Sequence, residues 1–156
     1  MDLNFLQNSL RESLTQFHLS PTIRYKNIAF SSKKLSDLDD VTQTLRSLLP
    51  GYSVWQNPGR QGAPKSISSR QTLLHCISDI QQEGVIIHQP EQWSSHWPLL
   101  EKQAFWSALG MWQSQINVVL VFAESDEFQQ INNAYFKPKL IDGLTISVWC
   151  PMRAEQ

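Results

Sequence analysis

Apolar residues recur along the chain at spacings that alternate between those of helices and those of strands. Residues 1–18 carry large apolar side chains three or four positions apart, which predicts an amphipathic N-terminal helix (Leu3, Leu6, Leu10, Leu14 and Phe17). Pro21 ends this helix. Because the apolar stripe is narrow, we expect Leu6, Leu10 and Leu14 either to pack on this domain or to contact another protein.

Short apolar and β-branched runs separate further helical segments. Strands are predicted at residues 23–30, 52–56, 85–87, 118–123 and 144–149, and helices at residues 36–49, 64–80, 99–115 and 125–136. The run 118–123 is continuously apolar, which is typical of a central parallel strand buried on both faces. The run 144–149 alternates by two, which predicts a last strand at the sheet edge, and residues 150–156 follow as a short tail.

The alternation of helices and strands predicts the fold class. Strands that alternate with helices form βαβ units around a parallel sheet, and right-handed connections place helices on both of its faces. We expect one three-layer α/β domain over residues 1–156, with a mostly parallel sheet of about five strands and a Rossmann-like or P-loop-like arrangement.

Composition indicates where the protein is located and which partners are unfavoured, but it says little about activity. Charged residues are 17% of the chain, below the usual quarter, and the net charge of −1 gives no general attraction to nucleic acid or an anionic membrane. Cys76 and Cys150 are far apart in sequence and are expected to be reduced thiols. The chain starts without a secretory signal, and its apolar runs are too short to span a bilayer. We therefore expect a cytoplasmic protein that does not enter a membrane.

A phosphate-binding pattern lies between the second predicted strand and the next helix. Residues 59–66 read Gly-Arg-Gln-Gly-Ala-Pro-Lys-Ser, close to G-x-x-x-x-G-K-[ST]. Pro64 stands where the pattern needs its second glycine, and proline has no backbone N–H to offer a phosphate. The segment is either a degenerate phosphate cradle or a plain loop before a helix that starts at Pro64. The candidate phosphate ligands are Gly59, Arg60, Gly62, Lys65 and Ser66.

A second element strengthens the pattern. Glu124 follows the apolar run 118–123, where P-loop ATPases place a metal-associated carboxylate. Together the two elements resemble the Walker A and Walker B motifs. The resemblance implies that Lys65 would pair with phosphate, Ser66 would contact magnesium and Glu124 would polarise water. Capping of the following helix is the alternative role of Glu124.

Cations and aromatic residues suggest two further kinds of contact. Arg60, Lys65 and Arg70 form a local basic cluster that suits nucleic-acid phosphates, with Trp55 as a stacking face. Trp93 and Trp97 lie in a polar stretch, and tryptophan is enriched in the hot spots of protein interfaces. The alternative for these two tryptophans is a lid over the end of the sheet.

No complete catalytic set or metal-ligand spacing occurs in the sequence, so we expect no bound cofactor. The favoured function is a non-enzymatic interaction or adaptor subunit of a larger cytoplasmic assembly, bound to another protein subunit and built on a catalytically degenerate P-loop-like domain. Two alternatives stay open. One is a nucleotide-binding protein or weak NTPase that uses residues 59–66, and the other is a nucleic-acid-binding module that uses the basic cluster.

Overall fold

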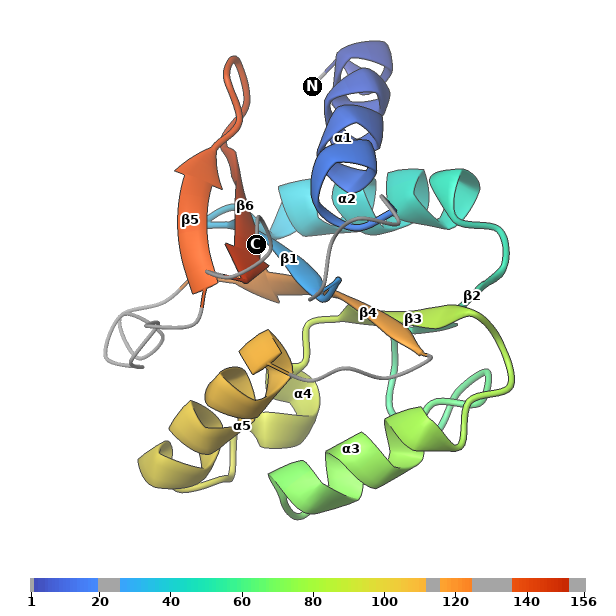
Figure 1. Cartoon of the computed structure of the whole chain (residues 1–156), viewed down its shortest axis with the longest axis vertical. Coiled ribbons are helices and arrows are strands. Elements are labelled where there is room, and N and C mark those ends of the chain that lie inside the picture. Colours follow the sequence, from blue (N-terminus) through green and yellow to red (C-terminus); the bar gives the residue numbers. More distant parts are fainter. Residues whose placement is uncertain (1, 20–25, 112–115, 125–135, 152–156) are drawn as a thin grey trace.

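The computed structural model describes residues 2–19, 26–111, 116–124 and 136–151. It contains one six-stranded sheet of order β2-β3-β4-β1-β6-β5 (Figure 1). The strands are β1 (Ile28–Ser32), β2 (Tyr52–Trp55), β3 (Gly84–His88), β4 (Asn117–Ala123), β5 (Phe136–Leu140) and β6 (Ile146–Pro151). The helices are α1 (Leu3–Phe17), α2 (Leu35–Leu48), α3 (Arg70–Ser78), α4 (Glu91–Ser94) and α5 (Leu99–Met111).

The sheet is mixed and mostly parallel, and helices cover both of its faces. Strands β2, β3, β4 and β1 run parallel, whereas β6 is antiparallel to β1 and β5 is antiparallel to β6. Helices α1 and α2 lie on one face, and α3, α4 and α5 lie on the other (Figure 1). This arrangement confirms the predicted single three-layer α/β domain.

The central strand β4 shows why the apolar run 118–123 is continuous. In β4, Val119, Val121 and Ala123 face α1 and α2, whereas Val118, Leu120 and Phe122 face the second helix layer. All residues from Val118 to Phe122 are at most 1% exposed. Both sides of the strand need apolar residues because both are covered.

The N-terminal helix is part of this core. Asp2 caps α1 by accepting hydrogen bonds from the backbone N–H groups of Asn4 and Phe5. The side chains of Leu6, Leu10 and Leu14 are at most 1% exposed and pack in the apolar layer between α1, α2 and the sheet. Burial of each leucine contributes roughly 1.5–3 kcal/mol. The helix predicted over residues 1–18 is observed from Leu3 to Phe17, and its apolar stripe packs against the core of its own domain.

The C-terminal part of the sheet differs from the prediction. The sheet has six strands rather than about five, because Phe136 begins β5 instead of ending a helix. The remainder of that predicted helix, residues 125–135, lies outside the described residues. Strand β6 lies between β1 and β5 rather than at the edge, and it includes Cys150 and Pro151, so the tail is shorter than expected.

Strand β5 escapes sequence detection because it is an edge strand. Its sequence, Phe-Lys-Pro-Lys-Leu, has a proline at its centre, which weakens the strand signal although apolar and charged residues alternate. The backbone N–H of Ile141 donates to Ile146, and the alternation of antiparallel bonds then turns the nitrogen of Pro138 away from β6. Proline is tolerated at an edge in this orientation, and lysine there discourages pairing with another strand.

Gly84, the first residue of β3, provides a prediction about stability. A methyl group on Gly84 would lie 2.5 Å from Cε2 of Tyr52 and 2.6 Å from the carbonyl oxygen of Asn117. The Tyr52 ring is fixed, because its hydroxyl lies 2.7 Å from Nε2 of His18 and 3.3 Å from Nδ2 of Asn117. We expect Gly84→Ala to lower the free energy of unfolding by about 2–3 kcal/mol in urea denaturation.

Gly51→Ala is the matched control for this substitution. Its added methyl group would meet only the flexible carboxylate of Glu83, at 3.3 Å. We expect a change below about 0.5 kcal/mol, as for most surface positions. Equal stability of the two variants would show that β2 and β3 do not pack as described.

Candidate functional site

The loop between β2 and α3 departs from the predicted phosphate cradle. Helix α3 begins at Arg70, and the Ser69 side chain caps it by accepting from the Thr72 backbone N–H at 3.3 Å. The prediction that this helix starts at Pro64 is wrong. Lys65 and Ser66 therefore lie in the loop, ahead of the helix N-terminus that a phosphate would need.

The tip of the loop uses its backbone N–H groups in turns. Gly59 donates to the carbonyl of Pro64, Arg60 to that of Asn57, and Ala63 to that of Arg60, over 2.9–3.2 Å. Gly59 and Gly62 have positive φ angles, +74° and +85°, which glycine adopts without strain. These three donors are engaged in the loop's own turns, and phosphate binding by residues 59–66 stays a prediction.

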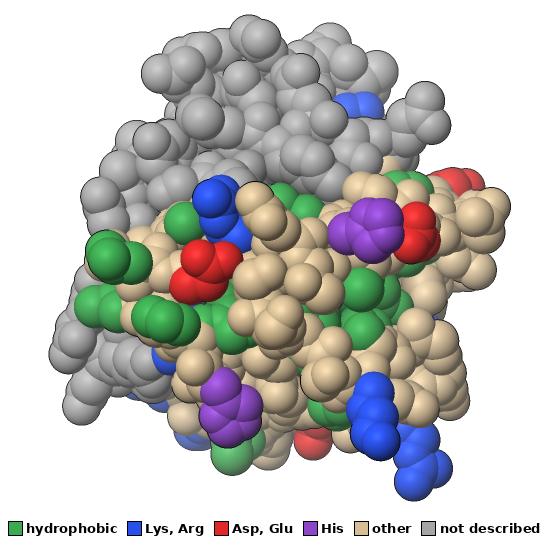
Figure 2. Space-filling model, turned by 90° about the horizontal axis from the view of Figure 1, so that it is seen from below, with side chains coloured by type: hydrophobic (Ala, Val, Ile, Leu, Met, Phe, Trp, Pro, Cys, Tyr) green, Lys and Arg blue, Asp and Glu red, His purple; other side chains and the backbone are tan. Residues whose placement is uncertain are grey.

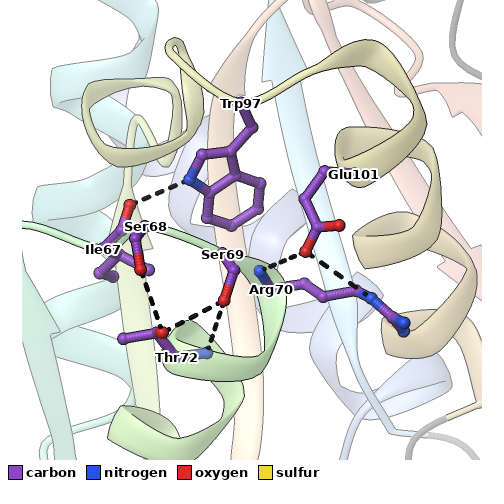
Figure 3. A network of polar contacts seen from close by, with 7 residues as sticks. All are labelled: Ile67, Ser68, Ser69, Arg70, Thr72, Trp97 and Glu101. Carbon is purple, nitrogen blue, oxygen red and sulfur yellow. Dashed lines mark hydrogen bonds and ion pairs between the residues drawn. The ribbon is translucent and has the colours of Figure 1, made fainter.

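The two loop tryptophans hold this loop in place. The indole Nε1 of Trp93 donates to the carbonyl of Pro64 at 2.7 Å. The indole Nε1 of Trp97 donates to the carbonyl of Ile67 at 2.9 Å, as Figure 3 shows. Trp93 is 4% exposed and Trp97 is 5% exposed. Their burial agrees with the lid alternative, since neither indole is available to a partner unless the fold opens.

One member of the predicted basic cluster, Arg70, already contacts a carboxylate. The backbone N–H of Arg70 donates to Oε1 of Glu101 at 2.9 Å, and its guanidinium Nε lies 3.8 Å from the same oxygen (Figure 3). Arg60 and Lys65 are exposed in the loop. Trp55 is 2% exposed, so it presents no stacking face to a nucleic acid.

Polar side chains gather at the carboxyl ends of the parallel strands, where α/β domains bind ligands. His88 ends β3 and is 4% exposed. Its Nε2 lies 3.4 Å from Oδ1 of Asp39, and its Nδ1 lies 2.6 Å from the hydroxyl of Thr42. A proton on Nε2 then faces the carboxylate, and Nδ1 accepts from Thr42. Burial lowers the pKa of His88, and the Asp39 carboxylate opposes this shift.

Asp39, His88 and Thr42 form a row with a carboxylate, an imidazole and a hydroxyl in the order of a catalytic triad. Unlike the nucleophile of a triad, the hydroxyl is not accessible to a substrate. A nucleophilic hydroxyl must meet a substrate. Thr42 is 0% exposed, and helix α2 and the sheet enclose it. The row therefore anchors His88 to α2 and provides no nucleophile.

Glu91 is the most unusual group at this edge, and sequence analysis did not single it out. Its Oε2 accepts a hydrogen bond from the Ala123 backbone N–H at 3.2 Å. Its Oε1 is buried without a hydrogen-bond partner in the described structure. Burial raises the pKa of Glu91 to about 7, and hydrogen bonds from its own backbone and from Ala123 oppose the shift. A buried, unpaired carboxylate marks either stored strain or a functional site.

Glu124 lies next to this position, at the end of β4. Its backbone N–H donates to the carbonyl of Ser32 at 3.0 Å, which ties β4 to the end of β1. Its side chain is half-buried. Glu124 and Lys65 follow different strands, β4 and β2, with β3 between them in the sheet. The proposed action of Glu124 on a nucleotide stays a prediction.

A groove of about 260 Å³, lined by both polar and apolar side chains, lies between α1 and the β5–β6 hairpin, which stand side by side in Figure 1. Apolar lining comes from Phe5, Phe17, Leu140 and Val148, with charged groups among the remaining lining residues. Phe5 is 43% exposed, Leu140 is 61% exposed, and the nearby Leu3 is 59% exposed. On the face seen in Figure 2, charged side chains of both signs lie among polar and apolar ones.

Within the described ranges, no group of three His, Cys, Asp or Glu residues could hold a metal ion. No described helix is long and apolar enough to cross a membrane. Comparisons of the chain with protein-family models, curated proteins and solved structures found no match.

Proposed function

We propose that this domain is a non-enzymatic interaction subunit, and that the groove between α1 and the β5–β6 hairpin binds its protein partner. One observation carries the proposal. Phe5 and Leu140 both line the groove, and both expose large apolar surfaces there, Phe5 from α1 and Leu140 from the hairpin. Single exposed apolar residues are ordinary, but exposed apolar residues gathered at a groove mark an interaction site.

The form of the groove favours a polypeptide over a small molecule. Its volume of about 260 Å³ is below the range of about 300–1,000 Å³ that is usual for small-ligand pockets. It suits one or two inserted side chains. Its lining combines apolar side chains with the charged residues Glu12, Lys139 and Asp142, and protein interfaces likewise combine apolar and polar surface.

The polar sites give less support to catalysis. The Thr42 hydroxyl is enclosed, and the loop at residues 59–66 uses backbone donors within its own turns. A degenerate P-loop-like ancestry remains compatible with the parallel strands β2, β3, β4 and β1. The interaction role therefore rests on the groove and needs no chemistry at the sheet edge.

A photo-crosslinking experiment tests this proposal. A photoreactive amino acid is placed at Leu140 or, as a control, at Leu100, which is 79% exposed at the start of α5 and does not line the groove. We expect position 140 to crosslink a specific protein in the native host and position 100 not to do so. Phe5→Ser should weaken that contact about thirtyfold, since truncating a hot spot costs at least about 2 kcal/mol. Equal crosslinking from both positions would contradict the proposal.

A further inference from the structure

We infer that the loop at residues 57–66 is a second contact surface, preorganised to bind an acidic segment of a polypeptide. This surface lies in the β2–α3 connection, whereas the groove lies between α1 and the hairpin. It also differs in chemistry, because it presents cations rather than apolar side chains. The inference goes beyond the proposed function, and it holds whether or not the groove binds a partner.

The loop is ordered well beyond what a connection requires. Residues 56–69 contain no helix or strand, and a connection of that length in a compact domain is usually functional. The carbonyls of Pro64 and Ile67 accept hydrogen bonds from two indoles, and Ala63 and Ile67 are buried at 7% and 5% exposure. Three turn bonds fix the tip. A loop that is already ordered loses little entropy when it binds.

The two cations of the tip are exposed to solvent, and their backbone positions lie on neighbouring parts of the loop. A methyl group on Gly59 would lie 3.8 Å from Cβ and Cγ of Lys65, so the stem of Lys65 runs beside Gly59 and its neighbour Arg60. Arg60 and Lys65 are both exposed, and no described carboxylate forms an ion pair with either. Two unpaired cations on a fixed backbone suit a partner with two or more carboxylates.

The same features disfavour nucleic acid as the partner. Affinity for nucleic acid comes largely from the phosphates that a protein neutralises, and this loop offers Arg60, Lys65 and the partly neutralised Arg70. Trp55 is buried, so no aromatic face is available for base stacking. The whole chain carries a net charge of −1, which adds no long-range attraction to a polyanion.

Fluorescence anisotropy with a labelled hexaglutamate peptide tests the inference. We expect the intact protein to bind this probe with an affinity that falls as salt is raised. The double substitution Arg60→Gln with Lys65→Gln should weaken binding at least about tenfold, since it removes both charge-assisted contacts. The matched control is Lys33→Gln with Lys34→Gln, which removes the same charge from another exposed pair and should change the affinity less than about twofold.

Three results would overturn the inference: no peptide binding by the intact protein, equal weakening in both double variants, or tighter binding of a single-stranded oligonucleotide than of the peptide. The second would show a net-charge effect only, and the third would identify a nucleic-acid surface. Phe5→Ser should leave peptide binding unchanged, because Phe5 lines the groove and not the loop. Failure of the groove proposal is thereby distinguishable from failure of this one.

Discussion

Trp97→Ala is expected to lower the free energy of unfolding by about 3–5 kcal/mol. Trp97 is 5% exposed and packs edge-on against Phe105, with ring centroids 6.0 Å apart. Its indole N–H also satisfies the carbonyl of Ile67 at 2.9 Å. The substitution leaves a cavity and a buried carbonyl without its donor, which is a large loss against a total stability of about 5–15 kcal/mol. Urea denaturation followed by circular dichroism measures the effect.

Two further variants separate the causes. Trp97→Phe keeps an apolar ring but removes the donor, so we expect a smaller loss of about 1–2 kcal/mol. His96→Ala alters an exposed neighbour and should stay within about 0.5 kcal/mol of the native protein. If Trp97→Ala unfolded like the native protein but lost a binding partner, the interface role predicted from the sequence would be restored.

Sequence periodicity predicted those elements in which the number of covered faces sets the pattern of apolar residues. Strand β4 has two covered faces, so each of its positions from Val118 to Phe122 is apolar. Helix α1 has one covered face, so Leu6, Leu10 and Leu14 recur at helical spacing. Such patterns follow directly from the geometry of an element and the number of its neighbours.

The loop before α3 could not be predicted in this way. A local match to a phosphate motif favoured a helix at Pro64, and proline is a common first residue of helices. Instead, Trp93 and Trp97 hold the carbonyls of Pro64 and Ile67 from about 30 positions away. The partners that decide the conformation of this loop are tertiary, so no pattern within the loop indicates them.

The polar groups at the sheet edge depend even more on tertiary contacts. His88 meets Thr42 across 46 positions of sequence, and Glu91 meets Ala123 across 32. The resemblance to a Walker B motif directed attention to Glu124 at this edge. Glu91 carries no such signal, since an acid in a polar stretch is normally exposed. Only the fold places its carboxylate against the end of β4.

Glu91→Gln is expected to stabilise the protein at pH 8 by up to about 3 kcal/mol and to change its stability little at pH 4.5. Burial raises the pKa of Glu91 from 4.5 to about 7, so the folded state favours the protonated carboxyl. The contribution of Glu91 is therefore fully favourable below pH 4.5 and is lost as the pH rises to about 7. Glutamine removes the charge and with it this loss.

His18 makes stability depend on pH in the opposite direction to Glu91, which makes the test more discriminating. Burial lowers the pKa of His18 from 6.5 to about 4, although its hydrogen bond to the Lys26 carbonyl opposes the shift. Stability from neutral His18 is full above pH 6.5 and is lost as the pH falls towards 4. Between pH 4.5 and 6.5 the two groups oppose each other in the native protein. In Glu91→Gln the opposing slope is removed. His18 and His88, whose pKa values are both lowered by burial, slope in the same direction, so stability should rise with pH over that range.

Urea denaturation at intervals from pH 4 to 8 measures both curves. Glu83→Gln is the matched control, because Glu83 is exposed and its substitution should shift stability by less than about 0.5 kcal/mol at every pH. If Glu91→Gln destabilised the protein equally at pH 5 and pH 8, the carboxylate would have a partner that the described residues do not include. A gain in stability at pH 8 would instead mean that the carboxylate is retained at a cost to the fold, as expected of a group kept for function.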